Sequence, residues 1–355
     1  MNSGKKQKKP LPKPPLIQDF INYMFCSETG ADFSIACRTM FFDVRNCEWS
    51  IPLIKKFSLN MEPYSKPIPM GTVLGKVRRS LMEELGLKRD VCVIVGGHDQ
   101  PVNAIGSGLR DGYAVNSMGT SECITPIINT MLPGSFITER GIPSEPLWDK
   151  GKFCCLAYNS TSGLLVQWYT DLVASEHESP FTYLDEHIPA EPTRIMVQPY
   201  LMGSGTPYMD AGARLALAGI DYGANKFSIY RAILEGLVLD QRLNLSVLAE
   251  EQVSVKHIIA VGGGSKSMPW LQIKADILEI PVSTLKVKEA GALGCAILCA
   301  TTAGIYSNIN EAAVSMSHIT KTIEPDLAHH DFYAEKFTLY RKLRDHVNEE
   351  SNFAI

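Results

Sequence analysis

The sequence lacks two features, each of which would point to a particular class of protein. It has no excess of basic residues, with 34 Lys and Arg against 38 Asp and Glu, so no binding to nucleic acid or to an anionic membrane is expected. No apolar run reaches the roughly 20 residues that a membrane-spanning helix needs. The most apolar segment, 290–304, is shorter and rich in Gly and Ala, which predicts a tightly packed helix instead.

Metal-binding and redox motifs are also missing. The nine cysteines show no C-x-x-C spacing, so reduced thiols and a cytoplasmic location are expected. The pair His329-His330 has no cluster of carboxylates or thiols near it at ligand spacing, which indicates a surface loop. We therefore assign no metal site to the protein's own side chains.

What is present indicates a globular α/β protein. The 355 residues are 45% hydrophobic, enough for a sizeable core divided between two domains. Residues 1–15 are rich in Lys and Pro and predict a disordered tail. Apolar runs predict strands, a buried one at 91–95 and others at 114–118, 257–261 and 282–287. Helical spacing predicts helices at 17–24, 77–85, 226–252, 290–304 and near the C-terminus.

The first candidate site is Gly96-Gly-His98-Asp99-Gln100, which follows a predicted strand. In open α/β sheets ligands bind beyond the carboxyl ends of strands, so Asp99 is placed to accept a proton from a bound hydroxyl. The alternative is structural, because Asp is a preferred N-cap and a helix beginning near Pro101 would need one. The segment alone favours this alternative.

Two glycine turns form the other candidates. Gly119-Thr120-Ser121 follows a predicted strand and offers amides and hydroxyls to phosphate oxygens, although a plain hairpin turn uses the same residues. Gly262-Gly-Gly-Ser-Lys-Ser267 lies between a strand and a helix, where a polar ligand can approach the backbone or where the glycines merely allow close packing. The second turn fits neither the P-loop nor the dinucleotide pattern, so a nicotinamide-dependent dehydrogenase is disfavoured.

The order of these sites and the sequence around them are similar to those of the FGGY family of carbohydrate kinases. The segment Val95-Gly-Gly-His-Asp-Gln is similar to the family's catalytic segment, and Met118-Gly-Thr-Ser-Glu to its phosphate turn. The stretch from Gly262 to Leu278, followed by Glu289-Ala-Gly-Ala-Leu-Gly, resembles the adenosine-binding region and is the most specific part of the match.

The resemblance implies an actin-like, ribonuclease H-like ATPase fold with ATP and a sugar bound between two domains. It implies that Asp99 is the general base that activates the sugar hydroxyl, and that Gln100 contacts the sugar. Phosphate oxygens would lie at Gly119, Thr120 and Ser121, and Mg²⁺ would neutralise the phosphates. The adenosine would lie at a second group of residues, namely Gly263, Gly264 and Ser267. A pentulose or hexulose is the favoured substrate, a polyol remains open, and so does a homo-oligomer.

One departure from the family pattern concerns the N-terminal part. No Asp-x-Gly-Thr phosphate loop precedes Asp19, so we expect 16–108 to be only the C-terminal part of the first, sugar-binding domain, and 109–355 to be the second, nucleotide-binding domain. Such a first domain would expose strand edges and apolar surface. The alternative function is therefore a catalytically inactive remnant that at most binds nucleotide or a partner chain.

Overall fold

The computed structural model describes residues 16–108 and 110–350, with side chains as far as 343. The predicted tail, residues 1–15, lies outside the described residues. The described chain forms two compact units. The first unit extends to His98 and includes 146–150, and the second comprises 99–145 and the chain from Gly151 onward. The predicted domains, 16–108 and 109–355, remain predictions.

The first unit contains short elements and no large sheet among its described residues. Its strands form three separate pairs: β1 with β4 in parallel, and β2 with β3 and β5 with β6 antiparallel. The elements are α1 (Ile17–Cys26), β1 (Ala31–Asp32), α2 (Phe33–Ala36), η1 (Cys37–Thr39), β2 (Phe42–Asp43), β3 (Glu48–Trp49), α3 (Ile51–Lys56), β4 (Pro67–Ile68), β5 (Val73–Lys76), α4 (Arg79–Glu84) and β6 (Cys92–Ile94).

The core of this unit is small and aromatic. Phe33 and Phe42 are buried, and the Trp49 ring meets Phe42 edge to face at 5.7 Å between centroids. Helix α1 confirms the predicted helix, but it exposes several of its apolar side chains, Ile17 by 76% and Phe20 by 50%. The face that α1 presents to solvent is therefore apolar in large part.

The buried strand predicted at 91–95 is only partly correct. The strand forms as β6, but Val91 is 41% exposed and Cys92 is exposed as well. Its one partner among the described residues is β5, so no neighbour covers its faces as a central position in a sheet would. The predicted helix at 77–85 is also shorter than expected and forms as α4, because the amides of Val77 and Arg78 donate to the carbonyls of Val91 and Phe25 instead of entering the helix.

The second unit is built on an eight-stranded mixed sheet. Its strand order is β16-β15-β14-β7-β8-β10-β9, with β11 also paired to β8. Strand β14 lies parallel to β7 and β15, while β7 and β8 form an antiparallel hairpin. The strands are β7 (Tyr113–Met118), β8 (Glu122–Ile128), β9 (Ser144–Pro146), β10 (Phe153–Cys155), β11 (Ala157–Asn159), β14 (His257–Val261), β15 (Val282–Leu285) and β16 (Ile319–Ile323).

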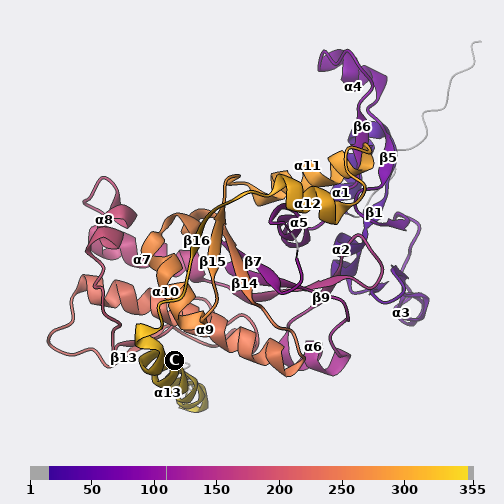
Figure 1. Cartoon of the computed structure of the whole chain (residues 1–355). Helices are drawn as coiled ribbons and strands as arrows, with labels where there is room; N and C mark the ends of the chain where they lie inside the picture. The colour runs from indigo at the N-terminus through magenta and orange to yellow at the C-terminus, as the bar shows by residue number, and fades with distance from the viewer. Residues whose placement is uncertain (1–15, 109, 351–355) are drawn as a thin grey trace, which may run out of the picture. The chain divides into compact units, whose positions relative to one another are not determined.

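Helices cover both faces of this sheet, with α5, α11 and α12 on one side and α9 and α10 on the other (Figure 1). The helices are α5 (Asp99–Gly106), α6 (Gly134–Arg140), α7 (Ser162–Ala174), α8 (Pro180–His187), α9 (Lys226–Glu250), α10 (Met268–Leu278), α11 (Ala290–Thr302), α12 (Ile309–Met316) and α13 (His330–Glu350), with 3-10 turns η2 (Gly263–Lys266) and η3 (Leu327–His329). A separate antiparallel pair joins β12 (Met196–Gln198) to β13 (Ala216–Ala218).

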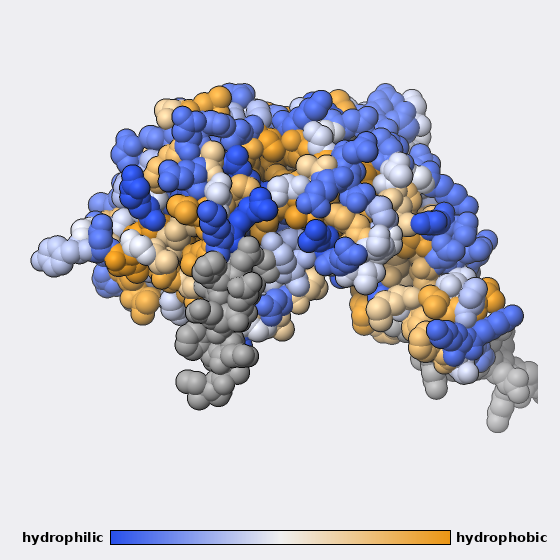
Figure 2. All heavy atoms as spheres, turned by 90° about the horizontal axis from the view of Figure 1, so that it is seen from below, coloured by the Kyte–Doolittle hydropathy of each residue, from blue (hydrophilic) through white to orange (hydrophobic). Residues whose placement is uncertain are grey.

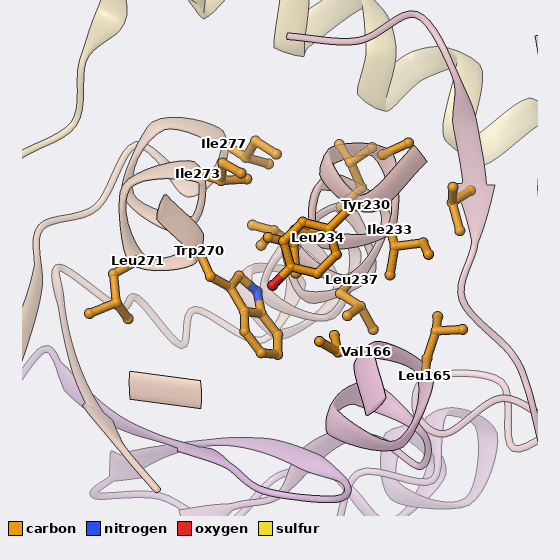
Figure 3. Packing of buried hydrophobic residues seen from close by; sticks show 14 of the residues in the cluster. Leu165, Val166, Tyr230, Ile233, Leu234, Leu237, Trp270, Leu271, Ile273 and Ile277 are labelled. Carbon is orange, nitrogen blue, oxygen red and sulfur yellow. The ribbon is translucent and has the colours of Figure 1, made fainter. Parts of the chain in front are cut away.

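Side-chain alternation along β14 explains why both faces are buried. Ile258 and Ala260 belong to the large core with α7, α9 and α10, whereas Ile259 and Val261 pack with Ala290 on the opposite face. The large core is shown in Figure 3, where side chains from the three helices meet. This arrangement is typical of an α/β domain and confirms the predicted fold class.

The predicted helices at 226–252 and 290–304 are both confirmed, as α9 and α11. Helix α9 begins with a capping box, in which the Asn225 side chain accepts from the Ser228 amide and the Ser228 hydroxyl accepts from the Asn225 amide. Helix α11 approaches α5 so closely that a Cβ on Gly294 would lie 2.1 Å from the Val102 carbonyl oxygen. Small residues at 290–304 are therefore needed for packing.

The surface loop predicted for the histidine pair is wrong. His329 ends η3 and His330 begins α13, where the rings lie near Glu191 and Glu279 respectively. No helix within 16–108 or 110–350 is long and apolar enough to cross a membrane. On the face shown in Figure 2, hydrophilic and apolar side chains are interspersed, as on most folded domains.

Candidate functional site

The turn 119–121 joins β7 to β8 and is braced by the start of helix α7. Gly119 N donates to Ser121 O at 3.0 Å, which closes the turn. The first amides of α7 bind its carbonyls, with Gly163 N to Gly119 O at 3.1 Å and Leu164 N to Thr120 O at 3.0 Å. A Cβ at Gly163 would lie 2.2 Å from Gly119 O, so only glycine permits this contact. The turn joins two antiparallel strands, as in the alternative of a plain hairpin turn, but the N-terminus of α7 also contacts it and fixes its shape.

A buried ion pair lies directly behind this turn. Lys274 Nζ contacts Glu122 Oε1 at 2.7 Å and Gln241 Oε1 at 2.5 Å, and Ser162 Oγ donates to Glu122 Oε2 at 2.7 Å. Both charged side chains are at most 1% exposed, and burial lowers the pKa of Lys274. Because a charge removed from water is costly unless it is fully partnered, this network holds β8, α7, α9 and α10 in one arrangement.

The second glycine turn follows β14 and crosses close to the first. Gly262 has φ of 88°, and a Cβ there would lie 2.8 Å from the Met118 carbonyl oxygen. A Cβ on Gly264 would lie 2.9 Å from atoms of both Met118 and Trp270. The turn lies between a strand and a helix, as predicted. It contains the 3-10 turn η2, and Ser267 then caps α10, accepting from Trp270 N at 3.3 Å.

The two glycine turns line one cavity of about 590 Å³. It brings together five of the predicted nucleotide-binding residues: Gly119, Thr120, Gly263, Gly264 and Ser267. Ser121, Asp99 and Gln100 do not line it. The volume is in the range of small-molecule sites. A second cavity, of about 670 Å³, lies near Gly112 and Lys256 at the other end of β7 and β14 and contains none of the predicted residues.

Sequence reasoning named five of the sixteen residues that line the cavity. Most of the others come from four helices and include Gly163, Gln167, Phe181, Asp185 and Tyr230. They belong to segments far apart in the chain and form no local motif, so only the packing of α7, α8, α9 and α10 brings them together. The one local signal for these residues was Ser162-Gly163 at the start of a helix, which could have indicated a binding site for an anion.

Asp99 is the first residue of helix α5, two residues earlier than the predicted start near Pro101. Its carboxylate therefore lies in the first turn, where the positive end of the helix dipole favours a negative charge. The neighbouring Gln100 is fixed to the sheet, since Ser117 Oγ donates to Gln100 Oε1 at 3.0 Å. Ser117 lies in β7, the strand that leads to the turn 119–121.

The segment before Asp99 is held by a buried acid in the first unit. His98 N donates to Ser34 Oγ at 2.8 Å, and the Ser34 hydroxyl donates in turn to Asp32 Oδ1. Asp32 is fully buried, and burial raises its pKa to about 7. A Cβ on Gly97 would lie 3.2 Å from Asp32 Oδ1, so glycine is needed for the backbone to pass this carboxyl group.

Neither unit offers an evident protein site for a cation. Within 16–108 and 110–350, no three His, Cys, Asp or Glu side chains gather in a way that could hold a metal ion. The cavity itself contains one acid, Asp185, and one lysine, Lys266.

The sheet order, the helices on both faces and the cavity edged by two glycine turns define an α/β protein of the actin-like ATPase class. The chain belongs to the FGGY family of carbohydrate kinases, whose N-terminal domain model matches residues 5–106 and whose C-terminal domain model matches residues 114–303. Enzymes of this family are phosphotransferases with an alcohol group as acceptor. The predicted family and fold class are both confirmed.

Two curated relatives illustrate the similarity. The chain is 26% identical over 334 residues to a xylulose kinase of Staphylococcus epidermidis and 28% identical over 333 residues to an autoinducer-2 kinase of Escherichia coli. The matches cover 92% and 90% of this chain but 66% and 62% of the relatives. The chain therefore spans slightly less than two thirds of the length of these kinases.

Solved structures give the same result for the fold. A "xyloylose kinase" from Brucella ovis matches with a TM-score of 0.85 at 25% identity, covering 93% of this chain and 68% of that one. Glycerol kinase from Plasmodium falciparum, solved with ADP, matches with a TM-score of 0.83 at 18% identity, covering 93% of this chain and 66% of that one. At such identity the second match bears on the fold alone.

Proposed function

We propose that this chain carries the phosphoryl-transfer machinery of an ATP-dependent carbohydrate kinase that acts on a hydroxyl group of a pentulose or hexulose. The observation that carries the proposal is the single cavity edged by Gly119-Thr120 and Gly263-Gly264, two turns that the sequence independently suggested for nucleotide binding. The names of its relatives support a pentulose, because xylulose is one. Nine free cysteines support a cytoplasmic location.

The cavity suits a nucleoside phosphate. The backbone at Gly263 is open to a ligand, since a Cβ there would have no protein atom closer than 4.0 Å, and the wall is largely apolar at Phe181 and Trp270. The polar turn 119–121 would hold phosphate oxygens through backbone amides and hydroxyls. Mg²⁺ would be bound by the phosphate oxygens, where it neutralises charge during transfer.

In the proposed reaction, Asp99 accepts the proton of the attacking sugar hydroxyl. The hydroxyl oxygen forms a bond to the γ-phosphorus, the bond from that phosphorus to the bridging oxygen breaks, and ADP leaves. Asp99 thus ends protonated and returns its proton to solvent. The hydrogen bond from Ser117 to Gln100 and the one from His98 to Ser34 keep the backbone on both sides of Asp99 in place.

The test is release of ADP from MgATP in the presence of a panel of ketoses and polyols. One sugar should stimulate ADP release, and Asp99→Asn should reduce the stimulated rate by about 100-fold or more. Asp331→Asn is the matched control, since Asp331 lies in the first turn of α13 as Asp99 lies in that of α5. Stimulation that survives in Asp99→Asn would refute the base assignment. If no compound stimulates release, the chain is at most a nucleotide-binding protein.

A further inference from the structure

One acidic side chain lines the cavity among the described residues, and the proposed reaction does not use it. Asp185 lies in α8 and is half-buried at the cavity wall. Tyr230 Oη donates to Asp185 Oδ1 at 2.9 Å, and the Ser267 hydroxyl also hydrogen-bonds to this carboxyl group. A carboxylate has about four acceptor positions, so two protein donors leave room for a ligand donor.

The position of Asp185 along the cavity indicates which part of a nucleotide it meets. Its partner Tyr230 stacks on Tyr169, with 6.5 Å between ring centroids. Tyr169 is six residues after Gly163 in α7, which is about 9 Å along a helix axis. In the proposed function the phosphates lie at the turn 119–121. Gly163 lies at this end of the cavity, because its amide donates to the Gly119 carbonyl of that turn. A nucleotide with its phosphates at the turn would therefore extend past its ribose and bring its base to Asp185.

The Trp270 ring forms part of the wall at this end of the cavity. Its side chain is 3% exposed, and Figure 3 shows the Trp270 and Tyr230 side chains pointing toward one another. The Trp270 Nε1 atom is itself buried from solvent, so it does not face a ligand. The inference therefore rests on Asp185, which is half-buried and keeps acceptor positions open.

We propose that Asp185 selects the base of the nucleotide by accepting a hydrogen bond from the 6-amino group of adenine. A purine without the amino group leaves the carboxylate short of a donor. A 6-oxo purine places an oxygen against it. The inference rests on the proposed function in that it requires a nucleotide in the cavity, but it requires no turnover.

The test is a comparison of two ligands by calorimetry, ADP and purine riboside 5′-diphosphate, which lacks only the amino group. The unsubstituted chain should bind ADP about tenfold to 100-fold more tightly, the value of one hydrogen bond to a charged group. Asp185→Ala should abolish this difference. Glu186→Ala is the matched control, because Glu186 is the next acid on α8, is exposed and does not line the cavity; it should keep the difference.

The outcomes separate the inference from the proposed function. Equal binding of the two ligands by the unsubstituted chain overturns the inference. This result needs no variant, so it does not depend on whether Asp185→Ala folds. A difference that persists in Asp185→Ala overturns it as well. If 2′-deoxy-ADP, and not the purine analogue, loses the Asp185-dependent affinity, the carboxylate reads the ribose. If ADP itself does not bind, the proposed nucleotide site is wrong, and the inference falls with it.

Discussion

Asp32 should make the stability of the first unit depend on pH in an unusual direction. The side chain is fully buried, its Oδ2 has no partner among the described residues, and burial raises its pKa from 3.8 to about 7. Below about pH 4 both the folded and the unfolded chain hold the proton. As the pH rises toward 7, the unfolded chain loses that proton while the folded chain keeps it, so the free energy of unfolding falls.

The size of this effect follows from the two pKa values. Each pH unit between them changes the free energy of unfolding by about 1.4 kcal/mol, so the full loss is about 4 kcal/mol. The measurement is urea unfolding from pH 4 to pH 8, followed by tryptophan fluorescence, because Trp49 packs against Phe42 in this core. Asp32→Asn keeps the Oδ1 acceptor for the amides of Ser34 and Ile35 but cannot ionise.

The difference between the two proteins isolates Asp32, because all other groups, including Asp19, titrate in both. The unsubstituted chain should lose stability relative to Asp32→Asn as the pH rises from about 4 to about 7, and the difference should then become constant. A difference that is independent of pH, or one that grows in favour of the unsubstituted chain, would refute the reasoning. It would mean that the carboxylate is ionised in the folded chain and is satisfied by its hydrogen bonds.

Three further substitutions test the architecture of the site. Gly163→Ala should push α7 away from the turn at Gly119 and weaken ADP binding by about tenfold or more, measured by calorimetry, since overpacking costs about 1–3 kcal/mol; unchanged affinity would contradict the proposed phosphate end. Lys274→Met should lower the free energy of unfolding by about 3–5 kcal/mol by leaving Glu122 buried without its counter-ion, and a second change, Glu122→Leu, should restore most of this loss in urea unfolding. Asn225→Ala removes the cap of α9 and should cost about 1 kcal/mol in the same assay, with no effect on ADP binding.

Patterns that depend on neighbouring residues in sequence were predicted well. The spacing of Ile229, Ile233 and Leu237 indicates a helix with a buried face, and α9 forms with its ends within two residues of those predicted. The glycine at 262 marks a turn because its φ of 88° and its approach to the Met118 carbonyl leave no room for a side chain. Such local requirements can be predicted from the sequence alone.

Features that depend on distant partners could not be predicted. Val91 to Val95 has the composition of a buried strand, yet its exposure is decided by the number of strands beside it, which no local pattern encodes. Asp185 shows the same limit for the site. Nothing in its own helix marks it as a site residue. Tyr230 in α9 and Ser267, the cap of α10, are its hydrogen-bond partners in the cavity wall.

The two interpretations of function share this cavity and differ only in what Asp99 does. An inactive nucleotide-binding remnant needs the turns at Gly119 and Gly263, and in it Asp99 would serve only the start of α5, where the helix dipole favours a negative charge. Both neighbours of Asp99 are hydrogen-bonded within their own units, the Gln100 side chain by Ser117 Oγ and the His98 amide to Ser34 Oγ. Since a general base works only when it is held within hydrogen-bonding reach of its substrate, this restraint favours the kinase. Asp99→Asn should therefore leave ADP affinity unchanged while abolishing sugar-dependent turnover, and a loss of ADP affinity instead would make Asp99 part of the nucleotide site.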